Sequence, residues 1–86
     1  MRITKEERSR FHKIVDDSIN KMNSPKNADK EHWSLLSTNK LERMINVESS
    51  ELSLAISDFN TDSVETECFD IINCSLFIAD NLRGNK

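Results

Sequence analysis

The sequence predicts an all-α protein, a short helical bundle of three main helices. Only one of the 86 residues is glycine and only one is proline, so few positions favour a turn over a helix. Strand-like alternation of apolar and polar residues does not persist, whereas apolar residues recur at helical intervals in three segments. At this length we expect a single domain, residues 1–86, whose bundle is completed by oligomerisation, because short chains bury a modest fraction of their surface.

The first helix is expected within residues 1–23. Thr4 and Glu7 have the spacing of a capping box, in which each side chain satisfies a backbone N–H at the helix start. The apolar residues that follow recur on one face: Phe11, Ile14, Val15, Ile19 and Met22. Ser24-Pro25 interrupts the pattern, so residues 24–37 are predicted to form a loop.

The second helix is expected over residues 38–59 and the third over residues 62–83. Asp62 and Glu65 repeat the capping-box spacing at the start of the third helix, and Gly84 follows its end, where glycine commonly stops a helix. Apolar residues cover most of the circumference of the third helix. We therefore expect that helix to be buried on several sides.

Composition excludes several classes of protein. The net charge of -3 argues against non-specific binding of DNA or RNA, which requires a basic surface. We expect a cytoplasmic protein without a membrane span or a signal peptide, because no apolar run approaches the roughly 18 residues of a span. Cys68 and Cys74 lie six residues apart and point to different sides of a helix, so we interpret them as buried free thiols.

Two glutamates interrupt the apolar stripe of the second helix. With 100° per residue, Leu41, Met44, Leu52, Ala55 and Phe59 fall within about 40° of Glu48, and Glu51 lies about 60° away. The serines and the remaining polar residues occupy the opposite side. Both glutamates are therefore predicted to point inward with the apolar residues.

The third helix carries a second acidic pair. Glu67 and Asp70 are three residues apart and share its one polar wedge. Four carboxylates between two helices would repel one another and lose hydration, and a hard divalent cation such as Mg²⁺ removes that conflict. The alternative interpretation, a solvated acidic surface, does not explain why both pairs fall on the inward faces.

At these residues the chain resembles a known family. Glu48-Ser-Ser-Glu51, then fifteen residues, then Glu67-Cys-Phe-Asp70, is similar to the ExxE…ExxD signature of the all-α MazG-like nucleoside triphosphate pyrophosphohydrolases. The resemblance covers about residues 32–83. It implies an enzyme that splits a nucleoside triphosphate into the monophosphate and pyrophosphate, with Mg²⁺ as cofactor and Mn²⁺ as a substitute.

The resemblance also implies roles for individual residues. Glu48, Glu51, Glu67 and Asp70 would be the metal ligands, with one of the four acting instead as general base. Four further residues are candidates for substrate binding: Asn73 for sugar or phosphate, Lys40 for a distal phosphate, and His32 and Trp33 for the base. Their alternatives are structural: Asn73 in a polar network, Lys40 in solvent and Trp33 in the core.

The partner expected besides the substrate is a second copy of the chain. Helices one and two cover two stripes of the third helix and leave an apolar patch, which a homodimer or higher homo-oligomer would bury: Phe69, Ile72, Leu76 and Ala79. Two other functions stay open. One is a non-catalytic helical protein that binds a nucleotide, and the other is a protein-interaction module, such as an accessory protein of a phage or mobile element.

Overall fold

The computed structural model describes residues 1–27 and 32–84, and these residues form helices joined by short turns. In chain order they are α1 (Lys5–Met22), the 3₁₀ helices η1 (Pro25–Asn27) and η2 (Trp33–Leu35), α2 (Thr38–Ser57) and α3 (Thr61–Leu82). The described ranges contain no strand, which confirms the all-α prediction. The two 3₁₀ helices fall within the predicted loop, and residues 28–31 of that loop lie outside the described residues.

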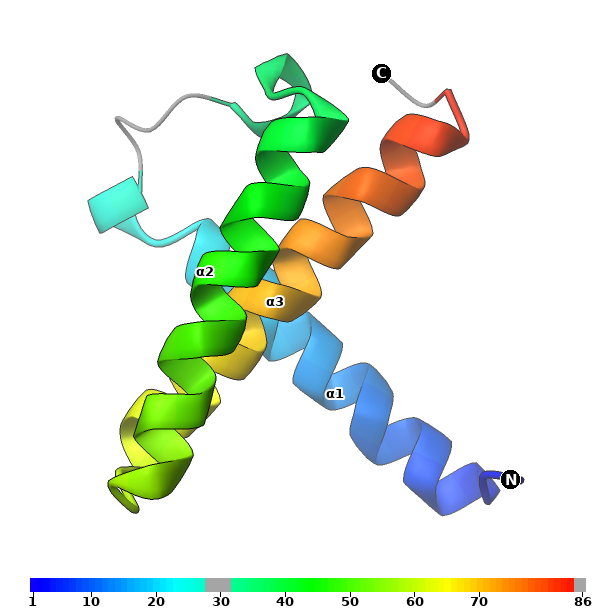
Figure 1. Ribbon diagram of the computed structural model, residues 1–86. Coiled ribbons are helices and arrows are strands. Elements are labelled where there is room, and N and C mark those ends of the chain that lie inside the picture. The colour runs from blue at the N-terminus through cyan, green and yellow to red at the C-terminus, as the bar shows by residue number, and fades with distance from the viewer. Residues whose placement is uncertain (28–31, 85–86) are drawn as a thin grey trace.

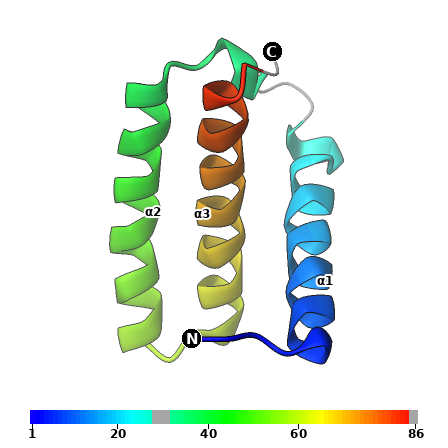
Figure 2. The ribbon, with the colours of Figure 1, turned by 90° about the vertical axis from the view of Figure 1, so that its right-hand side faces the viewer.

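The three long helices lie in a row with α3 in the middle. Figure 2 shows α2 on one side of α3 and α1 on the other. Figure 1 shows that α1 runs in a different direction from α2 and α3. Helix α3 packs against both neighbours. The third helix thus has the predicted central position, but it is less buried than expected: only Asn73 and Cys74 of α3 are fully buried.

Local sequence fixes where α1 and α2 begin. Thr4 and Glu7 form the predicted capping box: Glu7 N–H donates to Thr4 Oγ1 at 3.1 Å, and Thr4 N–H donates to Glu7 Oε1 at 2.9 Å. Ser37 caps α2 by accepting a hydrogen bond from Lys40 N–H at 3.1 Å. These short-range hydrogen bonds explain why the starts of both helices could be predicted closely.

The turn between α2 and α3 differs from the prediction. Helix α2 ends at Ser57, two residues early, because the next residues close a Schellman motif. Asn60 N–H donates to Ala55 O and Phe59 N–H donates to Ile56 O, both at 3.1 Å. Phe59 itself is left-handed, with φ of 53°, and is 92% exposed, so it does not belong to the inward stripe.

The N-cap of α3 is Asn60 rather than Asp62. The Asn60 side chain accepts a hydrogen bond from Ser63 N–H at 3.2 Å, and Asp62 lies inside the first turn, where its charge favours the helix dipole. Asn60 thus completes the end of α2 with its backbone and begins α3 with its side chain. At the other end of α3, Gly84 has φ of 74°, as its predicted position beyond the helix requires.

We expect Phe59→Gly to stabilise the fold. A side chain in the left-handed region costs roughly 1–2 kcal/mol, which exceeds the conformational entropy that glycine loses on folding. The gain, about 1 kcal/mol, should raise the Tm by several degrees in thermal unfolding followed by circular dichroism. Phe59→Ala is the control, because it removes the ring and keeps the β-carbon; an equal gain in that variant would show that backbone strain is not the cause.

Few apolar side chains are buried in this chain by itself. Among residues 1–27 and 32–84, the buried apolar ones are Leu41, Ala55 and Cys74. The apolar stripe of α1 is only partly covered, since Phe11, Ile14 and Ile19 remain 42–43% exposed. Both cysteines are free thiols, as predicted, but only Cys74 is buried and Cys68 is half-buried.

Candidate metal centre

A cavity of about 540 Å³ opens between α2, α3 and the end of α1. Its walls combine acidic, basic and aromatic side chains: Glu48 and Asp70; Lys21, Lys26 and Lys40; Trp33 and Phe77. Charges of both signs beside aromatic rings suit a ligand that joins anionic groups to a planar ring.

Three carboxylates meet beside this cavity. Glu48 of α2 and Glu67 and Asp70 of α3 each offer one oxygen, and these oxygens all lie within 4.8 Å of one another. Within the described residues this is the one group of three or more potential metal ligands so close together. All three side chains are half-buried.

Helical spacing explains this convergence. Leu41 and Ala55 lie seven residues before and after Glu48, two turns away in each direction, and both are buried. Glu48 therefore sits in the middle of the buried stripe of α2. Glu67 and Asp70 lie one turn apart on α3, so both reach the same neighbour.

The group has the chemistry that a hard divalent cation requires. Oε2 of Glu48 and Oε2 of Glu67 are buried and have no hydrogen-bond partner. A buried carboxylate oxygen without a partner is costly, and a cation that takes oxygen ligands would supply one. The residues thus fit Mg²⁺ or Mn²⁺, with water and ligand oxygens completing the coordination.

Glu51 does not join the group. Its side chain is exposed, so the inward orientation predicted for it is wrong in this fold. The helical projection placed Glu51 at the edge of the stripe, and α3 covers only the centre, where Glu48 lies. Glu51 still acts on the group at a distance, because its negative charge is one of those that raise the pKa of Glu48.

Glu48 takes up a proton more readily than an ordinary carboxylate. Burial raises its pKa to about 8, with further contributions from the close approach of the Glu67 side chain and the negative charges of Asp70, Glu67 and Glu51. The neighbouring Cys74 thiol also has a raised pKa, because of burial and the charges of Glu48 and Asp70. Cys74 is therefore kept protonated and unreactive.

We expect the metal-free protein to lose thermal stability as the pH rises from about 5 to about 8. In that window Glu48 stays protonated in the folded chain, where its pKa is about 8, and is ionised in the unfolded chain, where its pKa is near 4.5. Deprotonation therefore favours unfolding, and above pH 8 this group adds no further loss. Millimolar Mg²⁺ should restore the Tm at the high-pH end, because the cation takes the place of the proton.

The measurement is the Tm by circular dichroism at each pH, with and without Mg²⁺. Glu48→Gln is the matched variant, because it keeps the shape of the side chain and cannot ionise. Its Tm should change little across the same window. An unchanged slope in Glu48→Gln would assign the pH dependence to another group.

Lys21, near the end of α1, is a site residue that the sequence reasoning missed. Its Nζ donates to Asp70 Oδ1 at 2.6 Å and to Thr66 O at 3.3 Å. The only local signal was a lysine in the last turn of a helix, which is the usual place for a solvated cation. The contact with Asp70 spans 49 residues of sequence, so no local pattern could reveal it.

Asn73 is 2% exposed and lies between α1 and α3. Its Nδ2 donates to Ser18 O at 2.9 Å, and its Oδ1 is buried without a partner. Since a carbonyl can only accept, the amide nitrogen must face Ser18 and the acceptor Oδ1 must face away from it. This orientation supports the structural role considered for Asn73 and gives an acceptor, rather than a donor for phosphate, on its other side.

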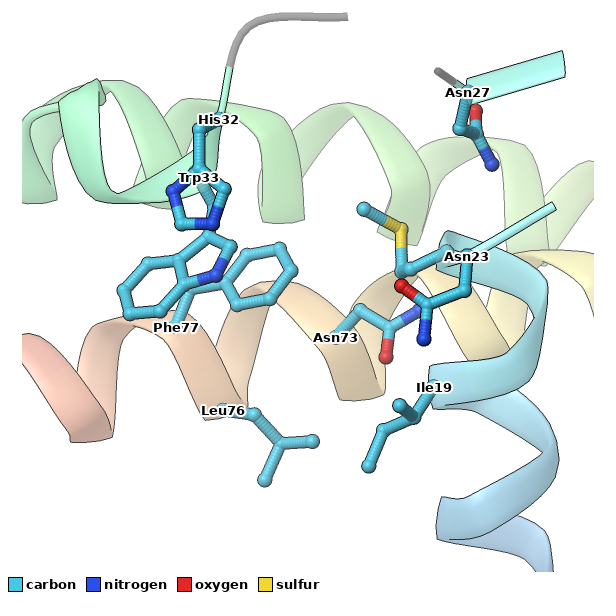
Figure 3. A pocket seen from close by; sticks show the side chains of 9 residues that line it. Ile19, Asn23, Asn27, His32, Trp33, Asn73, Leu76 and Phe77 are labelled. Atoms are coloured by element: carbon cyan, nitrogen blue, oxygen red, sulfur yellow. The ribbon is translucent and has the colours of Figure 1, made fainter. Parts of the chain in front are cut away.

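Trp33 and His32 border a smaller pocket of about 230 Å³. The Trp33 ring stacks on Phe77, with centroids 4.9 Å apart and planes 3° from parallel, and His32 lies 5.4 Å from Trp33. Figure 3 shows these rings at one end of the pocket and the amides of Asn23 and Asn73 at the other. Trp33 is half-buried: it packs on Phe77 and borders both the 230 Å³ pocket and the 540 Å³ cavity.

Lys40 is exposed and lines the 540 Å³ cavity. It lies on the wall that α2 forms, as Glu48 does. Of the eight predicted site residues, the structure therefore brings three carboxylates together. Two of the three, Glu48 and Asp70, line the 540 Å³ cavity together with Asn73, Trp33 and Lys40, whereas Glu67, Glu51 and His32 do not.

No helix among the described residues has the length and apolar character needed to cross a bilayer. Comparisons with known proteins identify no relative: no family model, no curated protein and no solved structure matches the chain.

Proposed function

We propose that the chain is a MazG-like, Mg²⁺-dependent nucleoside triphosphate pyrophosphohydrolase, which converts a (d)NTP to the (d)NMP and pyrophosphate. The observation that carries the proposal is the meeting of Glu48, Glu67 and Asp70 beside a cavity with lysines and aromatic rings on its other walls. The ExxE…ExxD spacing supports the same reading.

Each part of the cavity has a task in this reaction. Glu48, Glu67 and Asp70 would hold Mg²⁺, which would neutralise charge on phosphate oxygens and activate water. Lys21, Lys26 and Lys40 bring ammonium groups to the same cavity, where they would bind the phosphate chain. The aromatic wall of Trp33 and Phe77 would position the base by stacking.

A substrate screen tests the proposal. Each (d)NTP is incubated with the protein and Mg²⁺, and the products are quantified by ³¹P NMR. We expect pyrophosphate and the monophosphate in equal amounts, and none when the metal is removed with a chelator. Inorganic phosphate with a diphosphate would indicate a different phosphohydrolase.

One observation favours a second candidate, a metal-dependent nucleotide-binding protein without catalytic activity. With Glu51 exposed, three carboxylates rather than four meet at the cavity. Tight binding of nucleotide with Mg²⁺ and no product in the screen would select this function. An interaction module with no response to nucleotide or metal is the remaining alternative.

We also propose that the bundle is completed by a second copy of the chain. A compact monomer of 9.9 kDa exposes about 5,200 Å² and a compact chain of 86 residues has a radius of gyration of about 12 Å. This chain exposes 6815 Å² and has a radius of gyration of 14.0 Å. The excess is about 1,600 Å² per chain, or about 3,200 Å² for two chains, which lies within the range that obligate homodimers bury.

A further inference from the structure

The ammonium of Lys21 lies beside Asp70, one of the three carboxylates that could hold a metal ion. Lys21 Nζ lies 2.6 Å from Asp70 Oδ1 and 3.3 Å from Thr66 O. The two charged side chains are shielded, with 20% and 29% of their surfaces exposed. Among the described residues, the other ion pair, Lys13 with Asp17, lies within α1 and is more exposed.

Asp70 thus takes part in two interactions. It pairs with Lys21, and it belongs to the group whose oxygens lie within 4.8 Å of one another. A divalent cation bound by that group would come close to the ammonium. An ammonium and a divalent cation on the same carboxylate are neighbouring positive charges in a shielded site, so the binding of each opposes the binding of the other.

The surroundings offer Lys21 a second position. Its flexible stem can turn the ammonium away from Asp70 into the cavity that Lys21 already lines. Lys26 and Lys40 line the same cavity. Three ammonium groups on one cavity match a chain of phosphates, which would give Lys21 a new anionic partner.

We propose that Lys21 is an internal counter-cation that competes with the divalent metal for Asp70 and, when the metal binds, turns to the polyphosphate of the ligand. The proposal rests on the proposed metal site. Lys21 is then a positioning residue that couples the binding of metal to the binding of polyphosphate. The metal alone binds weakly, because it must displace the Lys21 ammonium from Asp70. A polyphosphate binds the displaced ammonium and so strengthens the binding of the metal.

The test measures two affinities in Lys21→Met, which removes the charge and keeps most of the stem. The first is for Mn²⁺ alone, from the free-ion signal in electron paramagnetic resonance. The second is for the preformed Mg²⁺–tripolyphosphate complex, by calorimetry. We expect Mn²⁺ to bind about tenfold more tightly and the complex about tenfold more weakly than to the wild type, within the usual range of coupling between sites.

Lys13→Met is the matched control. It changes the net charge equally and breaks the exposed pair with Asp17, so both affinities should stay at the wild-type values. Lys21→Gln is a second variant, because it keeps a donor for Asp70 and Thr66 without the charge. It should shift both affinities in the same directions as Lys21→Met. These opposite shifts distinguish a competing cation from a tie that merely holds α1 against α3.

Three outcomes would overturn the proposal. If the wild type binds Mn²⁺ and both Lys21 variants bind it equally well or more weakly, Lys21 does not compete with the metal. The proposed metal site would remain. Absence of Mn²⁺ binding in the wild type would reject the metal site as well. Loss of helicity in both Lys21 variants would show that the pair is a structural tie.

Discussion

Glu48→Gln, Glu67→Gln and Asp70→Asn are each expected to lower the Mg²⁺-dependent release of pyrophosphate by at least ~100-fold while leaving helicity intact. The three oxygens lie within 4.8 Å of one another, and the loss of one charged ligand removes several kcal/mol of charge stabilisation. Glu48→Gln should also raise the Tm of the metal-free protein at pH 8, because it removes a buried carboxylate that is forced to ionise. Activity and stability would therefore change in opposite directions.

Two controls keep this prediction specific. Glu42→Gln and Glu65→Gln also remove one negative charge each, from exposed positions of α2 and α3, and should change activity little. Equal losses in the two groups of variants would mean that net charge, rather than the carboxylate group, determines activity. Glu51→Gln decides a separate question: a loss as large as that in Glu48→Gln would show that the exposed Glu51 turns inward when metal and nucleotide bind.

The second large effect is expected from Leu76→Glu. We expect sedimentation equilibrium at micromolar concentration to give a mass of at least twice 9.9 kDa for the wild type. Leu76 is 39% exposed on α3, within the patch that we assign to the second copy. A buried, unpaired charge in such an interface costs several kcal/mol, so the variant should dissociate and lose most of its cooperative unfolding transition.

Ser75→Glu is the control for this variant. It introduces the same charge one residue away, at an exposed polar position, and should leave the mass and the Tm close to those of the wild type. A wild-type protein that is stable and active as a species of 9.9 kDa would end the proposal of an oligomer.

The parts of this structure that could be predicted from sequence are those with local causes. The helix starts at Thr4 and Ser37 depend on hydrogen bonds that span three residues, and the convergence of Glu48 with Glu67 and Asp70 depends on helical periodicity. The turn was harder, because the left-handed residue that ends α2 is Phe59 rather than the glycine that usually marks it.

The parts that could not be predicted depend on contacts between helices. A helical projection gives the direction of Glu51 but not the width of the strip that α3 covers. It gives no signal at all for Lys21, whose long side chain crosses from α1 to α3. Both residues border the proposed metal site, so sequence reasoning predicted the meeting of Glu48, Glu67 and Asp70 but not the placement of Glu51 and Lys21 around it.

The shared cap at Asn60 has a consequence for the order in which the chain folds. Because this residue ends α2 and begins α3, the two helices form a hairpin whose contacts are close in sequence, and such contacts form early. All three clustered carboxylates belong to that hairpin, whereas Lys21 arrives only when α1 docks across 49 residues of chain. A hairpin of α2 and α3 without α1 would therefore carry the three carboxylates and lack the lysine that pairs with Asp70.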